Sequence, residues 1–368
     1  MTSIIITYHN EPLEVLTDCL KQIKETIDIQ HEIIVVDDCS DKPLPSLEGV
    51  TIIRNLVNVG VGQSFDAGVK QAKGENLIIM ACDIRFVKNN WASLLVKEIE
   101  MHPKAWTCTT CVGLNMRSQC CDADIINGKC TGENCKNPDN PLNNMDFAKR
   151  RVKNHWHGAT FIAFHDHESN PRKPIGYKSI LEAKWLGRDS TKEGSYEVPC
   201  VLGAIYGVKK SWYEYIDGWW GHRQWGTLEP YISIKSWMMG GSCRVAPHIE
   251  TGHIFKKKGT HGLRQENFQF NKLLTATLFV EDYKRLTNFL PNTGSKVKAR
   301  QMLSECPIME KREEYKGKFV MTFDNLCQKF NIDLRKERMI QIPESIFKNT
   351  PNNMELATII RKIYSEQK

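Results

Sequence analysis

Residues 3–11 read SIIITYHNE, and residues 32–40 read EIIVVDDCS. Each stretch begins as a short apolar run rich in β-branched residues, which is typical of a buried strand, and each ends in polar residues. Between them, apolar residues recur at steps of three and four, which predicts a helix with one apolar face: Leu13, Leu16, Leu20, Ile23 and Ile27. The chain therefore begins as strand, helix and strand.

The same alternation continues to about residue 101. The apolar runs at 50–53 and 76–81 predict two more strands, and helical spacing predicts helices over 62–73 and 91–101. Strands that alternate with helices form a mostly parallel sheet flanked by helices, so we expect an α/β fold. Ligands of such sheets bind beyond the carboxyl ends of the strands. That rim should carry the residues that follow the strands: Thr7 to Glu11, Asp37, Asp38 and Asp83.

Two later segments differ in character from this pattern. Residues 118–144 are rich in Asp, Asn, Gly, Pro and Cys and are expected to form an inserted loop. After about residue 294, short mixed helical patterns with alternating charges follow. We therefore predict one domain over residues 1–294 and a C-terminal helical appendage over residues 295–368.

The overall composition is that of a soluble globular protein. Hydrophobic residues make up 41% of the 368 residues and charged residues 25%. No apolar run approaches the roughly 20 residues that cross a bilayer, and Met1–Thr7 lacks the features of a signal peptide, so we expect a cytoplasmic protein without a membrane partner. The formal net charge of +7 permits a polyanionic partner such as nucleic acid.

The order of the motifs resembles a known family. In the N-terminal half the motifs are ITYHNE (6–11), IVVDDCS (34–40), NVG (58–60), DAG (66–68) and AKGE (72–75). In the second half they are WGTLE (225–229), the pair Gly240–Gly241, GHIF (252–255) and the segment 271–283. Over roughly residues 2–290 this series is similar to the inverting GT-A glycosyltransferases, and more closely to the polypeptide N-acetylgalactosaminyltransferases.

The resemblance implies the GT-A fold, a single nucleotide-binding α/β domain that transfers a hexosyl, pentosyl or N-acetylhexosaminyl group. It implies a uridine-diphosphate sugar as donor. The residues expected to bind that donor lie at or near the predicted rim: Thr7, His9, Glu11, Asp37, Asp38, Asn58, Gly60 and Asp66. One carboxylate of the Asp37–Asp38 pair is expected to accept hydrogen bonds from the uridine base or ribose.

The family also holds a divalent metal with an acidic motif after the fourth strand and a later His. Asp83 takes the last position of that motif, and His253 is the later ligand, whereas Ala81 stands at the first acidic position. The alternative register would place Arg85 at a ligand position, which a cation cannot fill. Oxygen and imidazole ligands suit Mn²⁺ or Mg²⁺, and such an ion stabilises a diphosphate leaving group.

The resemblance places a catalytic carboxylate at Glu229. The next residue is Pro230, so the second acid of inverting relatives is missing. This favours a retaining mechanism, in which Glu229 orients the acceptor and Asp83 contributes through the metal.

The acceptor is predicted from charge and aromatic residues. Trp225 and the run Lys256, Lys257 and Lys258 flank the expected site, and they favour a polyanion, with hydroxymethylated pyrimidines of viral DNA as the first hypothesis. Trp219 and Trp220 would assist by stacking, unless they pack the core. The alternatives are a protein or surface-glycan acceptor and, because of Ala81 and Pro230, a catalytically inactive nucleotide- or carbohydrate-binding module. The sequence predicts neither the transferred sugar nor the oligomeric state.

The cysteine cluster suggests zinc but has unusual spacing. The residues concerned are Cys108, Cys111, Cys120, Cys121, Cys130 and Cys135. Cys-x2-Cys is only half of a zinc site, so we expect free thiols and no stoichiometric zinc. His155, His157, His165 and His167 alternate along strand-like segments and are expected to pack or to line an acceptor groove.

Overall fold

The computed structural model describes residues 1–86, 89–114, 125–126, 129–134, 151–255 and 264–335. Contacts between residues divide the chain into two compact units, Met1–Ile332 and Asp333–Lys368. The described helices and strands belong to the first unit. The predicted Lys256, Lys257 and Lys258 lie outside the described residues, as does most of the predicted insert.

The first four strands form a parallel sheet. They are β1 (Thr2–Tyr8), β2 (His31–Asp37), β3 (Val50–Arg54) and β4 (Asn76–Ala81). The sheet continues through strands from the second half of the chain: β6 (Ala105–Leu114), β12 (Tyr196–Glu197), β13 (Ile205–Lys209) and β14 (Ser242–Ile254). The order is β12-β14-β6-β13-β4-β1-β2-β3, with β5 (Ile84–Phe86) beside β14 and β9 (Arg151–Trp156) beside β6. Only β13 and the short strands β5, β9 and β12 run antiparallel to their neighbours.

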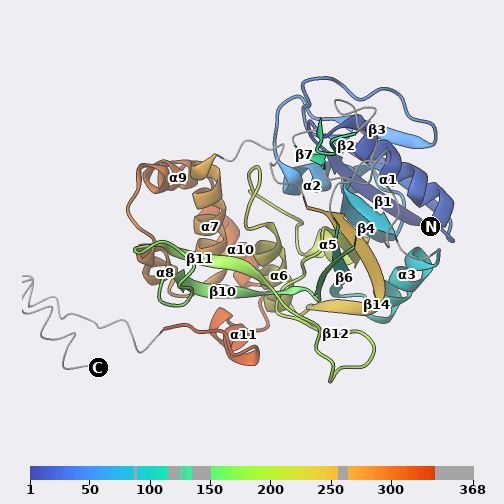
Figure 1. Cartoon of the computed structure of the whole chain (residues 1–368). Coiled ribbons are helices and arrows are strands. Elements are labelled where there is room, and N and C mark those ends of the chain that lie inside the picture. Colours follow the sequence, from blue (N-terminus) through green and yellow to red (C-terminus); the bar gives the residue numbers. More distant parts are fainter. Residues whose placement is uncertain (87–88, 115–124, 127–128, 135–150, 256–263, 336–368) are drawn as a thin grey trace, which may run out of the picture. The chain divides into compact units, whose positions relative to one another are not determined.

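The helices of the N-terminal part pack on this sheet (Figure 1): α1 (Leu13–Thr26), α2 (Val61–Gln71) and α3 (Trp91–Met101). α1 buries Val15, Leu16, Cys19 and Ile23, and α2 packs against β1 and β2. These elements lie within two residues of the predicted ones, and the predicted α/β fold is confirmed. The spacing of apolar residues was sufficient to predict these helices, because each of them buries one apolar face against the same sheet.

The parallel register brings the ends of the strands to one edge of the sheet. Thr7 lies beside Val36 on one side and Ala81 on the other, and Tyr8 lies beside Asp37. The polar residues that follow β1, β2 and β4 therefore meet at one rim, as the sequence predicts.

A second layer comes from later parts of the chain. The antiparallel pair β10 (Ala159–Asp166) and β11 (Lys178–Trp185) packs against helices. The later helices are α5 (Lys210–Tyr215), α6 (Leu228–Met238), α7 (Gln265–Phe279), α8 (Tyr283–Phe289), α9 (Gly294–Ser304), α10 (Ile308–Lys316) and α11 (Phe323–Lys329). Of these, α6, α7 and α8 pack against the pair. The short pair β7 (Ile125–Ile126) and β8 (Lys129–Cys130) stands apart.

The helices beyond residue 294 belong to the first unit. α9 and α10 pack on α7, and α11 packs on α6. Contacts mark the boundary of this unit at Ile332, and the division predicted at residue 295 stays a prediction. Among the described residues, the helices are all too short or too polar to cross a bilayer.

Candidate active site

A pocket of about 740 Å³ opens at the rim where β1 and β4 end. Eight of the residues predicted from the sequence line it: Thr7, His9, Glu11, Asp38, Asp83, Trp225, Glu229 and His253. They come from the end of β1, from the loops after β1, β2 and β4, from the turn before α6 and the first turn of that helix, and from the end of β14. The sheet thus gathers residues that lie up to about 245 positions apart in the sequence into one cavity.

Asp83 and His253 face each other in this pocket. β14 pairs with β5 so that His253 lies beside Ile84, and Nε2 of His253 is 3.5 Å from Oδ1 of Asp83. This separation is long for a hydrogen bond but suits two ligands of one divalent ion. In the described part of the chain, no group of three or more His, Cys, Asp and Glu could hold a metal. The pair therefore fits Mn²⁺ or Mg²⁺ only when the diphosphate supplies further oxygen ligands.

Arg85, which the alternative register would place at the metal, points into the protein. Its guanidinium is buried and donates hydrogen bonds to the carbonyl oxygens of Cys82, Ile84 and Val15. It does not line the pocket. This arrangement favours the register in which Asp83 is the ligand.

The buried carboxylate of Asp38 organises the loop that follows β3. Its Oδ1 accepts hydrogen bonds from Asn55 Nδ2 and from the backbone N–H of Val59, both at 2.9 Å, and its Oδ2 accepts one from the N–H of Gly60 at 2.7 Å. Asp38 therefore lines the pocket while its oxygens hold loop 55–60 in place.

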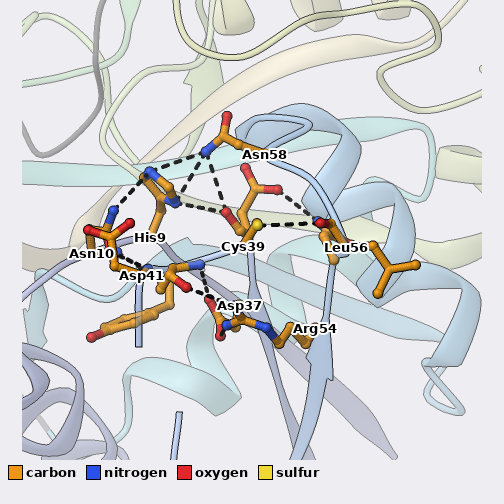
Figure 2. Close-up of polar contacts among 12 residues, drawn as sticks. His9, Asn10, Asp37, Cys39, Asp41, Arg54, Leu56 and Asn58 are labelled. Carbon is orange, nitrogen blue, oxygen red and sulfur yellow. Dashed lines mark hydrogen bonds and ion pairs between the residues drawn. The ribbon is translucent and has the colours of Figure 1, made fainter. Parts of the chain in front are cut away.

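His9 is held by the same loop, as Figure 2 shows. Its Nδ1 donates to the carbonyl oxygen of Asp38 at 2.7 Å, which leaves Nε2 to accept a hydrogen bond from Asn58 Nδ2 at 3.2 Å. Asn58 itself does not line the pocket. It orients the His9 ring rather than presenting its own side chain.

Two predicted donor residues point away from the pocket, so a direct contact with the donor is not what their geometry supports. Asp37 is fully buried and pairs with Arg54. Burial alone would raise the pKa of Asp37. Hydrogen bonds from Ser40 and the Arg54 guanidinium nevertheless hold this pKa below its ordinary value. Asp66 accepts hydrogen bonds from Tyr213 Oη and the N–H of Trp219, and burial raises its pKa. Both carboxylates stabilise the walls of the pocket from behind. Gly60 likewise lies behind the lining.

Glu229 begins α6 and presents its carboxylate to the pocket. Tyr206 Oη donates to its Oε1 at 3.1 Å. Burial raises the pKa of Glu229 because the ionised form is poorly solvated there. A carboxyl group at this place can accept a hydrogen bond from a bound hydroxyl group or donate one to it, according to its protonation state.

The turn before α6 has an unusual backbone. Asp217, Gln224 and Thr227 have positive φ angles, as do the glycines at 218, 221 and 226. Asn271 of α7 fixes this turn, since its Nδ2 donates to the carbonyl oxygens of Arg223 (2.7 Å) and Gly226 (3.0 Å). Trp225 is thereby held at the pocket with 49% of its surface exposed.

Trp219 does not take the stacking position that the sequence suggested. It is fully buried, and its Nε1 donates to the carbonyl oxygen of Leu228. Its large apolar ring fills the core between α2 and β6. Trp225 is the tryptophan of this loop that lines the pocket.

The described cysteines of the predicted cluster are buried free thiols. Cys108 and Cys111 lie within β6, and burial raises the pKa of each to about 12. Cys130 is also buried, whereas Cys120, Cys121 and Cys135 lie outside the described residues. The expectation of free thiols without stoichiometric zinc stays a prediction, which elemental analysis of the purified protein checks.

Several lining residues carry no motif that sequence reasoning could use. They are Ser64 and Phe65 of α2, Tyr206 of β13, Glu182 and Trp185 of β11 and Phe268 of α7. Each is an ordinary member of its element's pattern. Only the packing of distant segments around the rim brings these side chains into the pocket.

Comparison with known proteins identifies the N-terminal part of this arrangement. Residues 3–119 match the family model "Glycosyl transferase family 2". This part of the chain is similar to the family 2 glycosyltransferases. The match covers the strands and helices that build the parallel half of the sheet and deliver Thr7, Asp38 and Asp83.

Residues 3–119 and the segments that follow them are similar to parts of longer proteins. "Probable N-acetylgalactosaminyltransferase 6" of Caenorhabditis elegans is 24% identical over 77% of this chain and 43% of its own length. Human "Polypeptide N-acetylgalactosaminyltransferase 14" is 24% identical over 77% of this chain and 46% of its own length. The chain thus spans less than half the length of these relatives. The predicted kinship with polypeptide N-acetylgalactosaminyltransferases is confirmed.

A solved structure shares the fold. The crystal structure of GalNAc-T7 with UDP, GalNAc and Mn²⁺ aligns with a TM-score of 0.62 and 17% identity, over 91% of this chain and 57% of that one. The predicted GT-A fold is therefore confirmed, and the family model and the relatives support the prediction of a glycosyltransferase.

Proposed function

We propose that the protein transfers a sugar from a UDP-sugar to a hydroxyl group with the help of a divalent ion. The observation that carries this proposal is the facing pair of Asp83 and His253 in a pocket that His9, Glu11 and Asp38 also line. GalNAc-T7, which has the same fold, was solved with UDP and Mn²⁺, and this supports the choice of donor and metal.

Each side chain then has a distinct task. Thr7, His9, Glu11 and the loop fixed by Asp38 would contact the nucleoside. Asp83 and His253 would hold Mn²⁺ or Mg²⁺, which neutralises the charge that develops on a leaving diphosphate. Glu229 would orient the acceptor hydroxyl. Pro230 follows it at the position where the resemblance implies a second acid, and this supports a retaining mechanism without an enzyme base.

For the acceptor, we propose a protein hydroxyl group. The described pocket lining contains aromatic and acidic side chains but no Lys or Arg, so it suits a neutral acceptor better than a phosphate-rich one. The names of the relatives point to polypeptide acceptors. Hydroxymethylated DNA stays the second candidate because Lys256, Lys257 and Lys258 directly follow the pocket residue Phe255. If DNA is the acceptor, we expect a viral enzyme that acts in the cytoplasm of the host cell.

Donor and acceptor can be tested separately. UDP-sugars are screened for hydrolysis with and without Mn²⁺, and transfer is then followed by mass spectrometry on threonine peptides and on hydroxymethylcytosine oligonucleotides. We expect Mn²⁺-dependent hydrolysis and transfer to peptide. Steeply salt-dependent DNA binding, lost when all three lysines become Gln, would favour DNA instead. Absence of hydrolysis with every donor and metal would favour an inactive binding module.

Replacing Glu229 with Gln should change the pH dependence of stability. Since burial raises the pKa of Glu229, the folded protein binds this proton more tightly than the unfolded chain does. The wild type therefore loses stability as the pH rises through that pKa, and Glu229→Gln should not. The variant should match the wild type near pH 4 and be more stable at pH 8, while transfer falls. Urea denaturation at both pH values measures this, and equal stability differences at both would contradict it.

A further inference from the structure

One wall of the pocket is a continuous series of contacts between side chains that lie far apart in the sequence. The Trp225 ring stacks on Phe268 with centroids 6.4 Å apart and planes at 14°. On Phe268 lies the ammonium group of Lys272, 4.2 Å from the ring centroid, and Lys272 Nζ is 3.0 Å from Oε1 of Glu182. Trp225, Phe268 and Glu182 all line the pocket, whereas Lys272 is buried behind it.

The Glu182 carboxylate is fixed from three elements. Besides Lys272 of α7, Tyr177 Oη donates to Oε1 at 2.6 Å, and His165 Nδ1 of β10 donates to Oε2 at 2.8 Å. Although burial opposes it, the Lys272 ammonium and hydrogen bonds from Tyr177, Ser179 and His165 lower the pKa of Glu182 to about 2. The carboxylate is therefore ionised and held in one orientation at any working pH.

Such a buried pair is a poor choice for stability alone. Removing two charges from water is costly, and well-packed apolar side chains of similar volume often stabilise a fold equally well. The pair here stands on a ligand pocket, and 20% of the Glu182 side chain remains exposed. A group bound in the pocket can therefore reach a rigid hydrogen-bond acceptor.

We propose that Glu182 is a specificity-determining residue for the acceptor and accepts a hydrogen bond from an uncharged hydroxyl or amide N–H close to the reacting hydroxyl. This inference rests on the proposed function. The donor-side residues Thr7, His9 and Asp38 come from the end of β1 and the loops after β1 and β2, whereas Glu182 comes from β11 and shares its wall with Trp225 and Phe268. A fixed carboxylate beside aromatic rings suits polar, non-anionic groups and repels phosphate.

The test compares Glu182→Gln with the wild type, using UDP-N-acetylgalactosamine, Mn²⁺ and two acceptors: a threonine peptide and a hydroxymethylcytosine oligonucleotide. Since a hydrogen bond to a charged group is lost, the KM for the peptide should rise about tenfold or more. The KM for the donor and the rate of UDP-sugar hydrolysis without acceptor should stay unchanged, which a merely structural role would not produce. Glu168→Gln, an exposed change in the same ribbon, is the matched control and should leave all values unchanged.

A second variant covers the chance that the single change unfolds the protein by leaving Lys272 buried without its partner. Glu182→Leu combined with Lys272→Met removes both charges and keeps an apolar filling. It should fold, bind UDP normally and show the same raised KM for the peptide.

Each remaining outcome decides against the inference. An unchanged peptide KM in both variants, or an equal rise in the donor KM, would show that Glu182 does not select the acceptor. A lower KM for the oligonucleotide in Glu182→Gln would show that the carboxylate repels the true acceptor. Hydrolysis by the wild type with transfer to neither probe would overturn the acceptor class alone, whereas absence of hydrolysis would overturn the proposed function and the inference with it.

Discussion

Replacing Asp83 with Asn, or His253 with Ala, is expected to abolish sugar transfer while leaving the fold intact. The two side chains lie 3.5 Å apart at the end of the sheet, and each would supply one ligand to the ion that neutralises the diphosphate. Stabilisation of this kind is worth several kcal/mol, so we expect a loss of roughly a thousandfold or more in kcat. Initial rates at saturating Mn²⁺ and donor measure it, and circular dichroism checks the fold.

Matched controls separate loss of the metal from general damage. His248→Ala changes an exposed His of the same strand β14, and Asp41→Asn changes an exposed Asp of a rim loop that is not part of the pocket. Both controls should keep near-normal rates. Titration of Mn²⁺ in the presence of UDP should show binding to the controls and not to the two site variants. Near-normal turnover of either site variant in chelator would refute the metal assignment.

Replacing Gly60 with Ala is expected to destabilise the protein strongly. Gly60 has φ 95° and ψ 170°, a conformation that only glycine adopts without strain. An added Cβ would lie 2.1 Å from the Cα of Gln224, so one backbone segment would have to move. Strain of about 1–3 kcal/mol and overpacking of about 1–3 kcal/mol should together lower the free energy of unfolding by about 2–6 kcal/mol.

The same change should reduce activity, because Gln224 precedes Trp225 and Gly226 of the pocket. Chemical denaturation measures the loss of stability, and Gly49→Ala serves as the control. Gly49 also has a positive φ, at 73°, but an added Cβ there meets no atom within 4 Å. The control isolates backbone strain from the clash. If both variants lose equal stability, the close approach of Gly60 to Gln224 is not what matters.

The N-terminal sheet and its rim could be predicted because their signals are local. An isoleucine-rich run predicts a buried strand, and apolar residues at helical spacing predict the helix that covers it. Parallel pairing then places Thr7 beside Ala81 and Tyr8 beside Asp37 without further information. The sequence alone therefore predicts that the polar residues at the ends of β1, β2 and β4 lie at one edge of the sheet.

Which rim residues face the ligand was decided only by the tertiary structure. Asp37 and Asp38 are neighbours in the chain, yet Asp37 forms a buried ion pair with Arg54, whereas Asp38 holds loop 55–60 at the pocket. Asp66 turns inward because the Tyr213 hydroxyl and the backbone N–H of Trp219 donate hydrogen bonds to its carboxylate there.

The wall of the pocket that contains Glu182 shows most clearly what the sequence alone does not predict. Glu182 and Lys272 are 90 residues apart, and Glu182 belongs to none of the motifs of the sequence. Secondary-structure periodicity determines which face of an element is apolar, and the sequence by itself determined that much here. The contact between side chains on separate elements depends on how those elements pack, and burial then makes the pairing of Glu182 with Lys272 obligatory, because neither charge could remain there alone.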